Sequence, residues 1–311
     1  MAVGAEFSIG AVVVNYNQRL LTEACVAALL RSDYPRLAVV LVDNGSTDGS
    51  GDYLRGRFPS LQVLETRRNL GFAGGSNVGL KYLLEGHVDL IFLLNNDTEV
   101  APDCASHLAN AALEHPDMAV FAPKIVYYDR PQVLWYAGGN IRLHRPQGAS
   151  HFGFGNPDAG QFDVQRRVTF VSGCAMAVRR CALERIGLFD EGFFAYCEDL
   201  DWCVRAGRLG YRALYVPTAR VCHRVSMTVL ANPKGERLGA YLLARNRFMV
   251  QRRYGSLASA VALVPLYLAS KPAQRAFAAL VRGRPQGSVA LLRGIADGLR
   301  QRLGDPPADW L

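Results

Sequence analysis

The sequence lacks any uninterrupted run of about 18 apolar residues, the length that a membrane-spanning helix requires. No basic segment followed by a long apolar core opens the chain, so we expect no signal peptide. The seven cysteines are odd in number and form no Cys-x-x-Cys pair, which favours reduced thiols over a disulfide framework. These absences predict a cytoplasmic protein that does not cross the membrane.

Two fingerprints of nucleotide and nucleic-acid binding are also missing. The stretch that begins at Gly71 has the spacing Gly-x-x-Gly-Gly instead of Gly-x-Gly-x-x-Gly, which argues against a nicotinamide or flavin site. RNA-binding aromatic motifs and zinc-ligand spacings are absent, so we expect no nucleic-acid partner despite the net charge of +8. Phosphorylated substrates and anionic membranes remain compatible with this charge.

The chain does contain alternating strand and helix patterns. Its 311 residues, of which 50% are hydrophobic and 20% charged, suffice for one large α/β domain with an appendage. Apolar, strand-like runs at residues 9–14, 37–42, 61–65 and 91–94 are separated by helical spacing, and further strands are expected at 168–179 and 213–216. Residues 127–167 form a looser excursion between them. This order predicts a doubly wound, mostly parallel, Rossmann-like sheet with right-handed crossovers.

Polar residues follow each of these predicted strands. Asn15 ends the first, Asp43 ends the second, and Asn95-Asn96-Asp97 ends the fourth. Ligands of open α/β sheets bind outside the carboxyl ends of the strands, so Asp97 is suited to a hard divalent cation whose shell substrate phosphates complete. Asp43 is suited to accept hydrogen bonds from a nucleobase or ribose. The alternative for both is an Asx turn that caps the next helix.

The glycine-rich stretch after the third strand is a candidate phosphate site. Backbone N–H groups of residues 71–79 at a helix start favour phosphate oxygens, and Arg67, Arg68 and Asn69 add donors for a diphosphate. A glycine-rich turn with nothing bound is the alternative interpretation.

An acidic cluster, Glu198-Asp199-x-Asp201, lies among aromatic residues that include Trp202. Three acids within four residues repel one another, which favours a general base with a raised pKa among them. Acids gathered at a helix N-terminus to complement its dipole are the alternative. His223 follows the last predicted strand and is a candidate metal ligand, although a lone histidine is more often structural.

The last fifth of the chain is basic and apolar. Residues 245–302 contain eleven Lys or Arg and one acidic residue, Asp297, among helical patterns at 257–269, 276–281 and 289–299. Such helices suit a membrane interface with arginines toward anionic head groups. Helices packed on the core with a solvated basic face are the alternative. We divide the chain at this change into residues 1–254 and a tail of residues 255–311.

Six ordered motifs resemble the inverting GT-A glycosyltransferases of family 2, and most of all their bacterial rhamnosyltransferase-like branch. The resemblance covers about residues 8 to 250. The motifs are Asn15-Tyr16-Asn17, Val42-Asp43-Asn44-Gly45-Ser46-Thr47-Asp48, Asn69-x-Gly71-Phe72-Ala73-Gly74-Gly75-x-Asn77-x-Gly79, Leu94-Asn95-Asn96-Asp97, Gly187-x-Phe189-Asp190-Glu191 and Glu198-Asp199-x-Asp201.

The resemblance implies a GT-A fold and specific roles. Asp97 would hold Mg²⁺ or Mn²⁺ with His223, and Asp199 would be the general base beside Glu198. The implied donor-side residues are Asn15, Asp43, Arg68, Asn69, Gly74, Asn77, Asn96 and Gly173, and the implied acceptor-side residues are Asp201 and Trp202. Arg245-Asn246-Arg247 resembles a late Arg-Asn motif that follows the catalytic domain. One departure is that the usual Asp-x-Asp metal signature is Asn95-Asn96-Asp97 here, which leaves a single carboxylate.

The implied reaction is single displacement at an anomeric carbon with inversion. dTDP-rhamnose is the first expected donor and a UDP-linked hexose or galactofuranose the second, with a glycan or polyprenyl-linked glycan as acceptor and the tail in peripheral contact with the inner face of the cytoplasmic membrane. Two other functions are alternatives. A catalytically silent GT-A-like scaffold predicts an incomplete acidic cluster, whereas the cluster is complete here. A nucleotidyltransferase needs paired metal carboxylates, which Asn95 and Asn96 do not supply.

Overall fold

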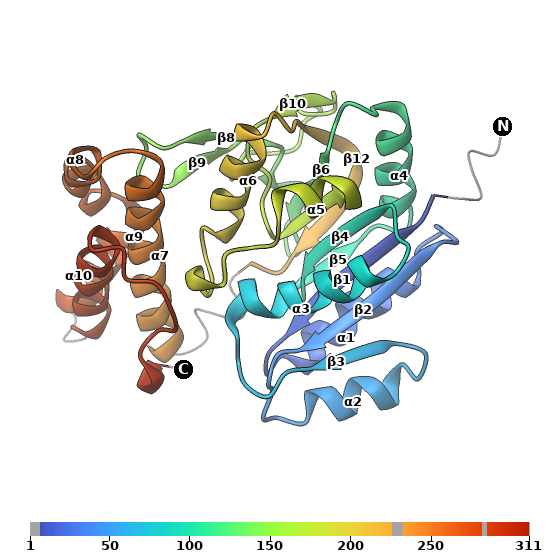
Figure 1. Ribbon diagram of the computed structural model, residues 1–311, viewed down its shortest axis with the longest axis horizontal. Helices are drawn as coiled ribbons and strands as arrows, with labels where there is room; N and C mark the ends of the chain where they lie inside the picture. Colours follow the sequence, from blue (N-terminus) through green and yellow to red (C-terminus); the bar gives the residue numbers. More distant parts are fainter. Residues whose placement is uncertain (1–6, 226–232, 282–284, 311) are drawn as a thin grey trace.

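The computed structural model describes residues 7–225, 233–281 and 285–310. Its centre is a mixed, mostly parallel sheet with the strand order β10-β12-β6-β11-β4-β1-β2-β3 (Figure 1). The strands on this path are β1 (Ile9–Asn15), β2 (Leu37–Asp43), β3 (Gln62–Glu65), β4 (Leu90–Asn95), β6 (Val120–Tyr127), β10 (Arg166–Val168), β11 (Ala175–Arg179) and β12 (Ala213–His223). The expected α/β architecture is therefore confirmed.

The helices follow the strands as the sequence pattern predicts. They are α1 (Arg19–Leu30), α2 (Ser50–Arg57), α3 (Gly71–Glu85), α4 (Cys104–Glu114), α5 (Arg180–Ile186) and α6 (Glu198–Arg208). β1 and β4 are buried almost throughout, because helices cover both faces of a parallel sheet. Gly79 of α3 lies so close to Val12 of β1 that a side chain there would collide with it.

Two strand predictions need correction. The run 168–179 is not one strand: β10 pairs with β12, β11 pairs with β4, and the residues between them leave the sheet. The last strand does not end at Val216, because β12 continues through Pro217 to His223 with a register shift between Val216 and Arg220. His223 is therefore the end of a strand and is positioned by it.

The excursion at residues 127–167 is partly ordered as strands. It contains β7 (Leu134–Tyr136), which joins the edge of β6, and the hairpin of β8 (Gly139–Arg142) and β9 (Gly148–His151). A further short strand, β5 (Thr98–Val100), pairs with the end of β12 and so brings residues 97–98 to His223.

Four helices form the C-terminal part: α7 (Pro233–Tyr254), α8 (Leu257–Leu268), α9 (Lys271–Val281) and α10 (Gln286–Leu299) (Figure 1). α10 packs closely on α7, because Gly294 and Gly298 leave room for the backbone of Tyr241 and Arg245. None of the helices in the described ranges is long and apolar enough to span a bilayer. Phe248 of α7 belongs to the same apolar cluster as residues of the tail helices, so packing continues across residue 254. The domain boundary at that residue stays a prediction.

Candidate active site

Three parallel strands bring the predicted polar residues to one edge of the sheet. Asn15 at the end of β1 lies opposite Asp43 at the end of β2, and Val14 lies opposite Asn95 at the end of β4. The carboxyl ends of these strands therefore form one surface, where ligands of open α/β sheets bind.

A chain of hydrogen bonds runs along this edge from Asp43 to Asn96. Asn15 donates to Asp43 Oδ1 at 3.0 Å and accepts from the Thr22 hydroxyl at 2.7 Å. That hydroxyl in turn accepts from the Asn96 amide at 3.0 Å. Ser46 also donates to Asp43 Oδ1. Sequence reasoning missed Thr22 and Ser46 as partners, since neither carries a charge or stands at a strand end.

Asp97 and His223 form a buried pair beside this chain. The His223 Nε2 and Asp97 Oδ1 atoms are 3.2 Å apart, and the two residues are 6% and 7% exposed. Asp97 Oδ1 and His223 Nδ1 have no hydrogen-bond partner among the described residues. Buried polar atoms without partners are uncommon, and a cation shared by Asp97 Oδ1 and His223 Nε2 would account for the first of these two.

A divalent cation fits this pair. A carboxylate oxygen suits Mg²⁺ or Mn²⁺, whereas an imidazole nitrogen favours a transition metal such as Mn²⁺ over Mg²⁺; neighbouring ligands in an octahedral shell of bonds of about 2.1 Å lie about 3 Å apart. The described part of the chain has no group of three or more His, Cys, Asp or Glu side chains able to hold a metal. Substrate phosphates would therefore have to complete the shell.

The acidic cluster begins α6, as one sequence interpretation expected. Asp199 Oδ2 accepts from the backbone N–H of Gly173 at 2.9 Å, and Oδ1 accepts from that of Leu200 at 2.7 Å. Burial raises the pKa of Asp199, and these backbone donors partly oppose the rise. Burial and the adjacent charge of Asp199 raise the pKa of Glu198 well above its usual range, and Glu198 Oε2 has no partner among the described residues. Asp199, held by two N–H groups, is therefore better suited than Glu198 to be an ionised base.

Cys174 links the cation pair to the acidic cluster. Its carbonyl accepts from Asn95 N at 2.9 Å, two residues before Asp97, and the preceding Gly173 binds Asp199. The pKa of the Cys174 thiol is raised by burial and by the charges of both Asp97 and Asp199. Asp97 and Asp199 thus both lie near Cys174, and the hydrogen-bond chain joins Asp43 to Asn96, the residue before Asp97.

The glycine-rich stretch begins α3 next to this region. Asn69 Oδ1 accepts from Gly71 N at 2.8 Å, so Asn69 shapes the turn into the helix. Asn77 is buried and its amide binds the backbone of Phe189, which leaves its polar atoms engaged within the protein. Gly74 packs against Leu70. The donor-side roles of these residues stay predictions.

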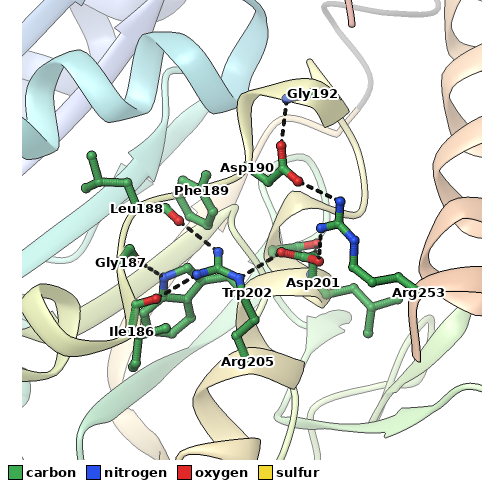
Figure 2. A network of polar contacts seen from close by, with 12 residues as sticks. Ile186, Gly187, Leu188, Phe189, Asp190, Gly192, Asp201, Trp202, Arg205 and Arg253 are labelled. Atoms are coloured by element: carbon green, nitrogen blue, oxygen red, sulfur yellow. Dashed lines mark hydrogen bonds and ion pairs between the residues drawn. The ribbon is translucent and has the colours of Figure 1, made fainter. Parts of the chain in front are cut away.

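Three residues of the predicted site make contacts within the protein that the resemblance does not imply. Arg68 lies on the surface, paired with Asp305 at 2.6 Å. Asp201 is fully buried and pairs with Arg205 at 2.9 Å and Arg253 at 2.7 Å (Figure 2).

Trp202, the next residue, is 1% exposed and donates to the Gly187 carbonyl at 2.8 Å (Figure 2). Asp201 and Trp202 therefore anchor α6 inside the protein, and their acceptor-side roles stay predictions.

The fold and the site define a GT-A type of nucleotide-sugar transferase. The mannosyltransferase PcManGT of Pyrobaculum calidifontis, solved with GDP-Man and Mn²⁺, has a similar fold with a TM-score of 0.56 at 21% identity, covering 94% of this chain and 87% of that one. Residues 11–187 match the family described as Glycosyl transferase family 2. The chain belongs to this family and is a glycosyltransferase.

Two relatives in the family carry names that refer to rhamnose. The "N-acetylglucosaminyl-diphospho-decaprenol L-rhamnosyltransferase" of Mycobacterium tuberculosis is 28% identical over 263 residues, which cover 78% of this chain and 84% of the relative. The "dTDP-rhamnosyl transferase RfbF" of Shigella flexneri is 24% identical, covering 79% of this chain and 80% of the relative. These similarities confirm the rhamnosyltransferase-like branch that the motifs indicated.

Proposed function

We propose that this glycosyltransferase moves rhamnose from dTDP-rhamnose to a hydroxyl of a polyprenyl-diphosphate-linked glycan, with inversion and with Mg²⁺ or Mn²⁺. The observation that carries the proposal is the buried Asp97–His223 pair, which the backbone of Gly173 and Cys174 links to Asp199. The silent-scaffold alternative is less favoured, because the acidic cluster that it predicts to be incomplete is complete.

The protein's own residues account for binding and for proton transfer. Asp43, fixed by Asn15, accepts hydrogen bonds from the base or ribose of the donor. Asp97 and His223 would hold the cation, which supplies positive charge against the donor diphosphate. Asp199 takes the proton of the acceptor hydroxyl as its oxygen bonds to the anomeric carbon and the bond from that carbon to the diphosphate breaks. Attack from the face opposite the leaving group inverts the configuration.

Donor and acceptor are inferred from the relatives. The names of the Mycobacterium tuberculosis and Shigella flexneri relatives combine rhamnose with a decaprenol-linked sugar and with dTDP. A UDP-linked sugar is the second candidate, since the cation pair and Asp43 would hold any nucleoside diphosphate.

Peripheral contact with the cytoplasmic membrane face would suit such an acceptor. Leu257, Val261 and Leu266 of α8 and Val289 and Leu292 of α10 are each at least half exposed. Exposed apolar side chains on the helices of a basic tail favour an interfacial position. Arg245 and Arg247 are buried, however, so only part of the positive charge of residues 245–302 is available to lipid head groups.

A transfer assay tests the proposal. Purified protein is incubated with dTDP-rhamnose, Mn²⁺ and N-acetylglucosamine diphosphate on a short polyprenyl chain, with UDP-glucose and UDP-galactofuranose in parallel. We expect a rhamnosylated product of inverted anomeric configuration. Transfer from a UDP-sugar alone would overturn the donor assignment, and a retained configuration would overturn the mechanism.

A further inference from the structure

The backbone immediately before the acidic cluster has an unusual conformation. Phe194, Tyr196 and Cys197 have φ values of 65°, 69° and 65°, which side-chain-bearing residues rarely adopt. The Ala195 N–H donates to the Phe193 carbonyl at 2.8 Å, which closes a tight three-residue turn at Phe194. Such backbone persists only where its surroundings hold it, and it is typical of functional sites.

Asn246 of α7 holds this segment. Its buried amide nitrogen donates to the carbonyls of Phe193 at 2.9 Å, Ala195 at 2.7 Å and Tyr196 at 2.8 Å. The Arg245 guanidinium donates to Asn246 Oδ1 at 2.9 Å, which turns the amide nitrogen toward the three carbonyls.

The segment held in this way leads to the proposed base. Cys197 is the residue before α6, and its carbonyl accepts from Asp201 N at 2.9 Å in the first turn of that helix. The Phe194 carbonyl points elsewhere and accepts from Ala73 N of α3 at 3.0 Å. The Asn246 amide therefore binds carbonyls on either side of Phe194, and Phe194 itself is the contact of this segment with the glycine-rich stretch.

The rest of α6 is fixed independently of Asn246. Arg253 pairs with both Asp201 and Asp190 at 2.7 Å, and Arg205 also pairs with Asp201 (Figure 2). Arg245 also donates to the Phe193 carbonyl at 2.9 Å, so loss of the Asn246 amide would loosen the segment mainly at Ala195 and Tyr196, without releasing the helix.

We infer that Asn246 is a positioning residue that sets the place of Asp199 by holding the backbone of residues 193–197 in its strained conformation. This role rests on the proposed function of Asp199 as the base. It assigns to the C-terminal helix α7 a part in catalysis, although α7 follows the segment matched by the family.

The test compares Asn246→Asp with two other variants. The aspartate keeps the shape of the side chain but offers oxygen instead of N–H to three carbonyls. Asn246→Ser retains one donor and guards against misfolding of the first variant. Phe248→Leu is the matched control, because Phe248 lies on the same helix but packs against Tyr267 in the tail cluster.

Two measurements are made on the full chain. Hydrogen exchange needs no substrate, and we expect faster exchange of the amides of residues 195–201 in Asn246→Asp than in the wild type or Phe248→Leu. With dTDP-rhamnose, Mn²⁺ and the short polyprenyl acceptor, we expect kcat to fall about 10-fold to 100-fold while KM for the nucleotide sugar changes less than about threefold. We expect the exchange rates and the kcat of Asn246→Ser to lie between those of Asn246→Asp and those of the wild type.

Exchange and kcat in Asn246→Asp that match those of Phe248→Leu would overturn the inference. The proposed function is tested separately by Asp199→Asn, because wild-type turnover in that variant would overturn the role of Asp199 as the base. An inactive Asp199→Asn beside a fully active Asn246→Asp would reject only the positioning role.

Discussion

The backbone N–H of Gly173 and the Oδ2 atom of Asp199 are joined by a hydrogen bond of 2.9 Å. This bond crosses from the loop between β10 and β11 to the first turn of α6, so that loop orients the carboxylate. A base must lie within hydrogen-bond reach of the proton that it removes, so the proposed role of Asp199 requires this orientation.

Asp199→Asn removes the proton acceptor and leaves the shape of the site almost unchanged. We expect kcat to fall by about 10² or more, with donor affinity retained. Steady-state transfer measures the first quantity, and a thermal shift with dTDP-rhamnose and Mn²⁺ measures the second. Asp117→Asn, on the surface beside Arg167, is the control. Wild-type turnover in Asp199→Asn would remove this residue from the role of base.

The pH dependence of turnover follows from the same carboxylate. Burial raises the pKa of Asp199 above the usual 3.8, so it gains a proton at a higher pH than an ordinary aspartate does. Because only the ionised form accepts a proton, we expect kcat to fall as the pH is lowered, with a midpoint above 3.8. A kcat profile that stays flat down to that value would contradict this prediction.

Glu198→Gln is expected to stabilise the protein at neutral pH. The pKa of Glu198 is raised in the folded state, so the native protein binds this proton more tightly than the unfolded chain. The associated stability is complete below the usual pKa of 4.5 and is lost as the pH rises through the raised value. A glutamine side chain does not ionise, so Glu198→Gln loses no stability as the pH rises and places no charge in the buried site.

Thermal unfolding measures this effect. At pH 8 we expect the variant to melt about 2 °C or more above the wild type, which corresponds to about 1 kcal/mol. The difference should shrink near pH 4.5, where the wild-type side chain is neutral. An equal difference at both pH values would show that the charge of Glu198 is not its cause.

His223→Ala tests the cation pair. We expect the affinity for Mn²⁺ in the presence of dTDP to fall about 10-fold or more, because a ligand and its buried partner are both disturbed. Calorimetric titration of Mn²⁺ into the protein with saturating dTDP gives the affinity without any transfer reaction. His144→Ala, at an exposed position, is the control. Unchanged Mn²⁺ affinity in His223→Ala would leave Asp97 without a protein co-ligand.

The sheet and one edge of the site were predictable from the sequence. Parallel strands buried on both faces appear as short apolar runs, and the polar residues that end them were expected at one edge. That expectation placed Asn15, Asp43 and Asp97 together. The position of His223 was not predictable, since Pro217 interrupts the strand pattern and the register shift near it lets β12 continue.

The burial of α6 was not predictable from the acidic and aromatic residues at its start. Its first turn is enclosed on several sides, with Glu198, Leu200, Asp201 and Trp202 all buried. The charged and aromatic residues at the start of α6 therefore do not indicate which side of the helix faces a ligand. One of the two arginines that neutralise Asp201, Arg253, is distant from it in the sequence. No local sequence pattern therefore reveals this ion pair.

Membrane contact through α8 is the last property to test. Leu257 and Val261 are 50% and 52% exposed and stand one turn apart, so their replacement removes apolar surface without disturbing the core. We expect Leu257→Gln with Val261→Gln to reduce flotation with anionic liposomes about 10-fold, in line with about 0.8 kcal/mol for each buried methylene group. Leu20→Gln is the matched control, because Leu20 is 68% exposed on α1. Binding should also weaken with salt, since lysine and arginine contribute through their charge. Equal flotation of the double variant and the Leu20 control would contradict a membrane-facing α8, and the tail would then be a packed helical unit with a solvated basic face.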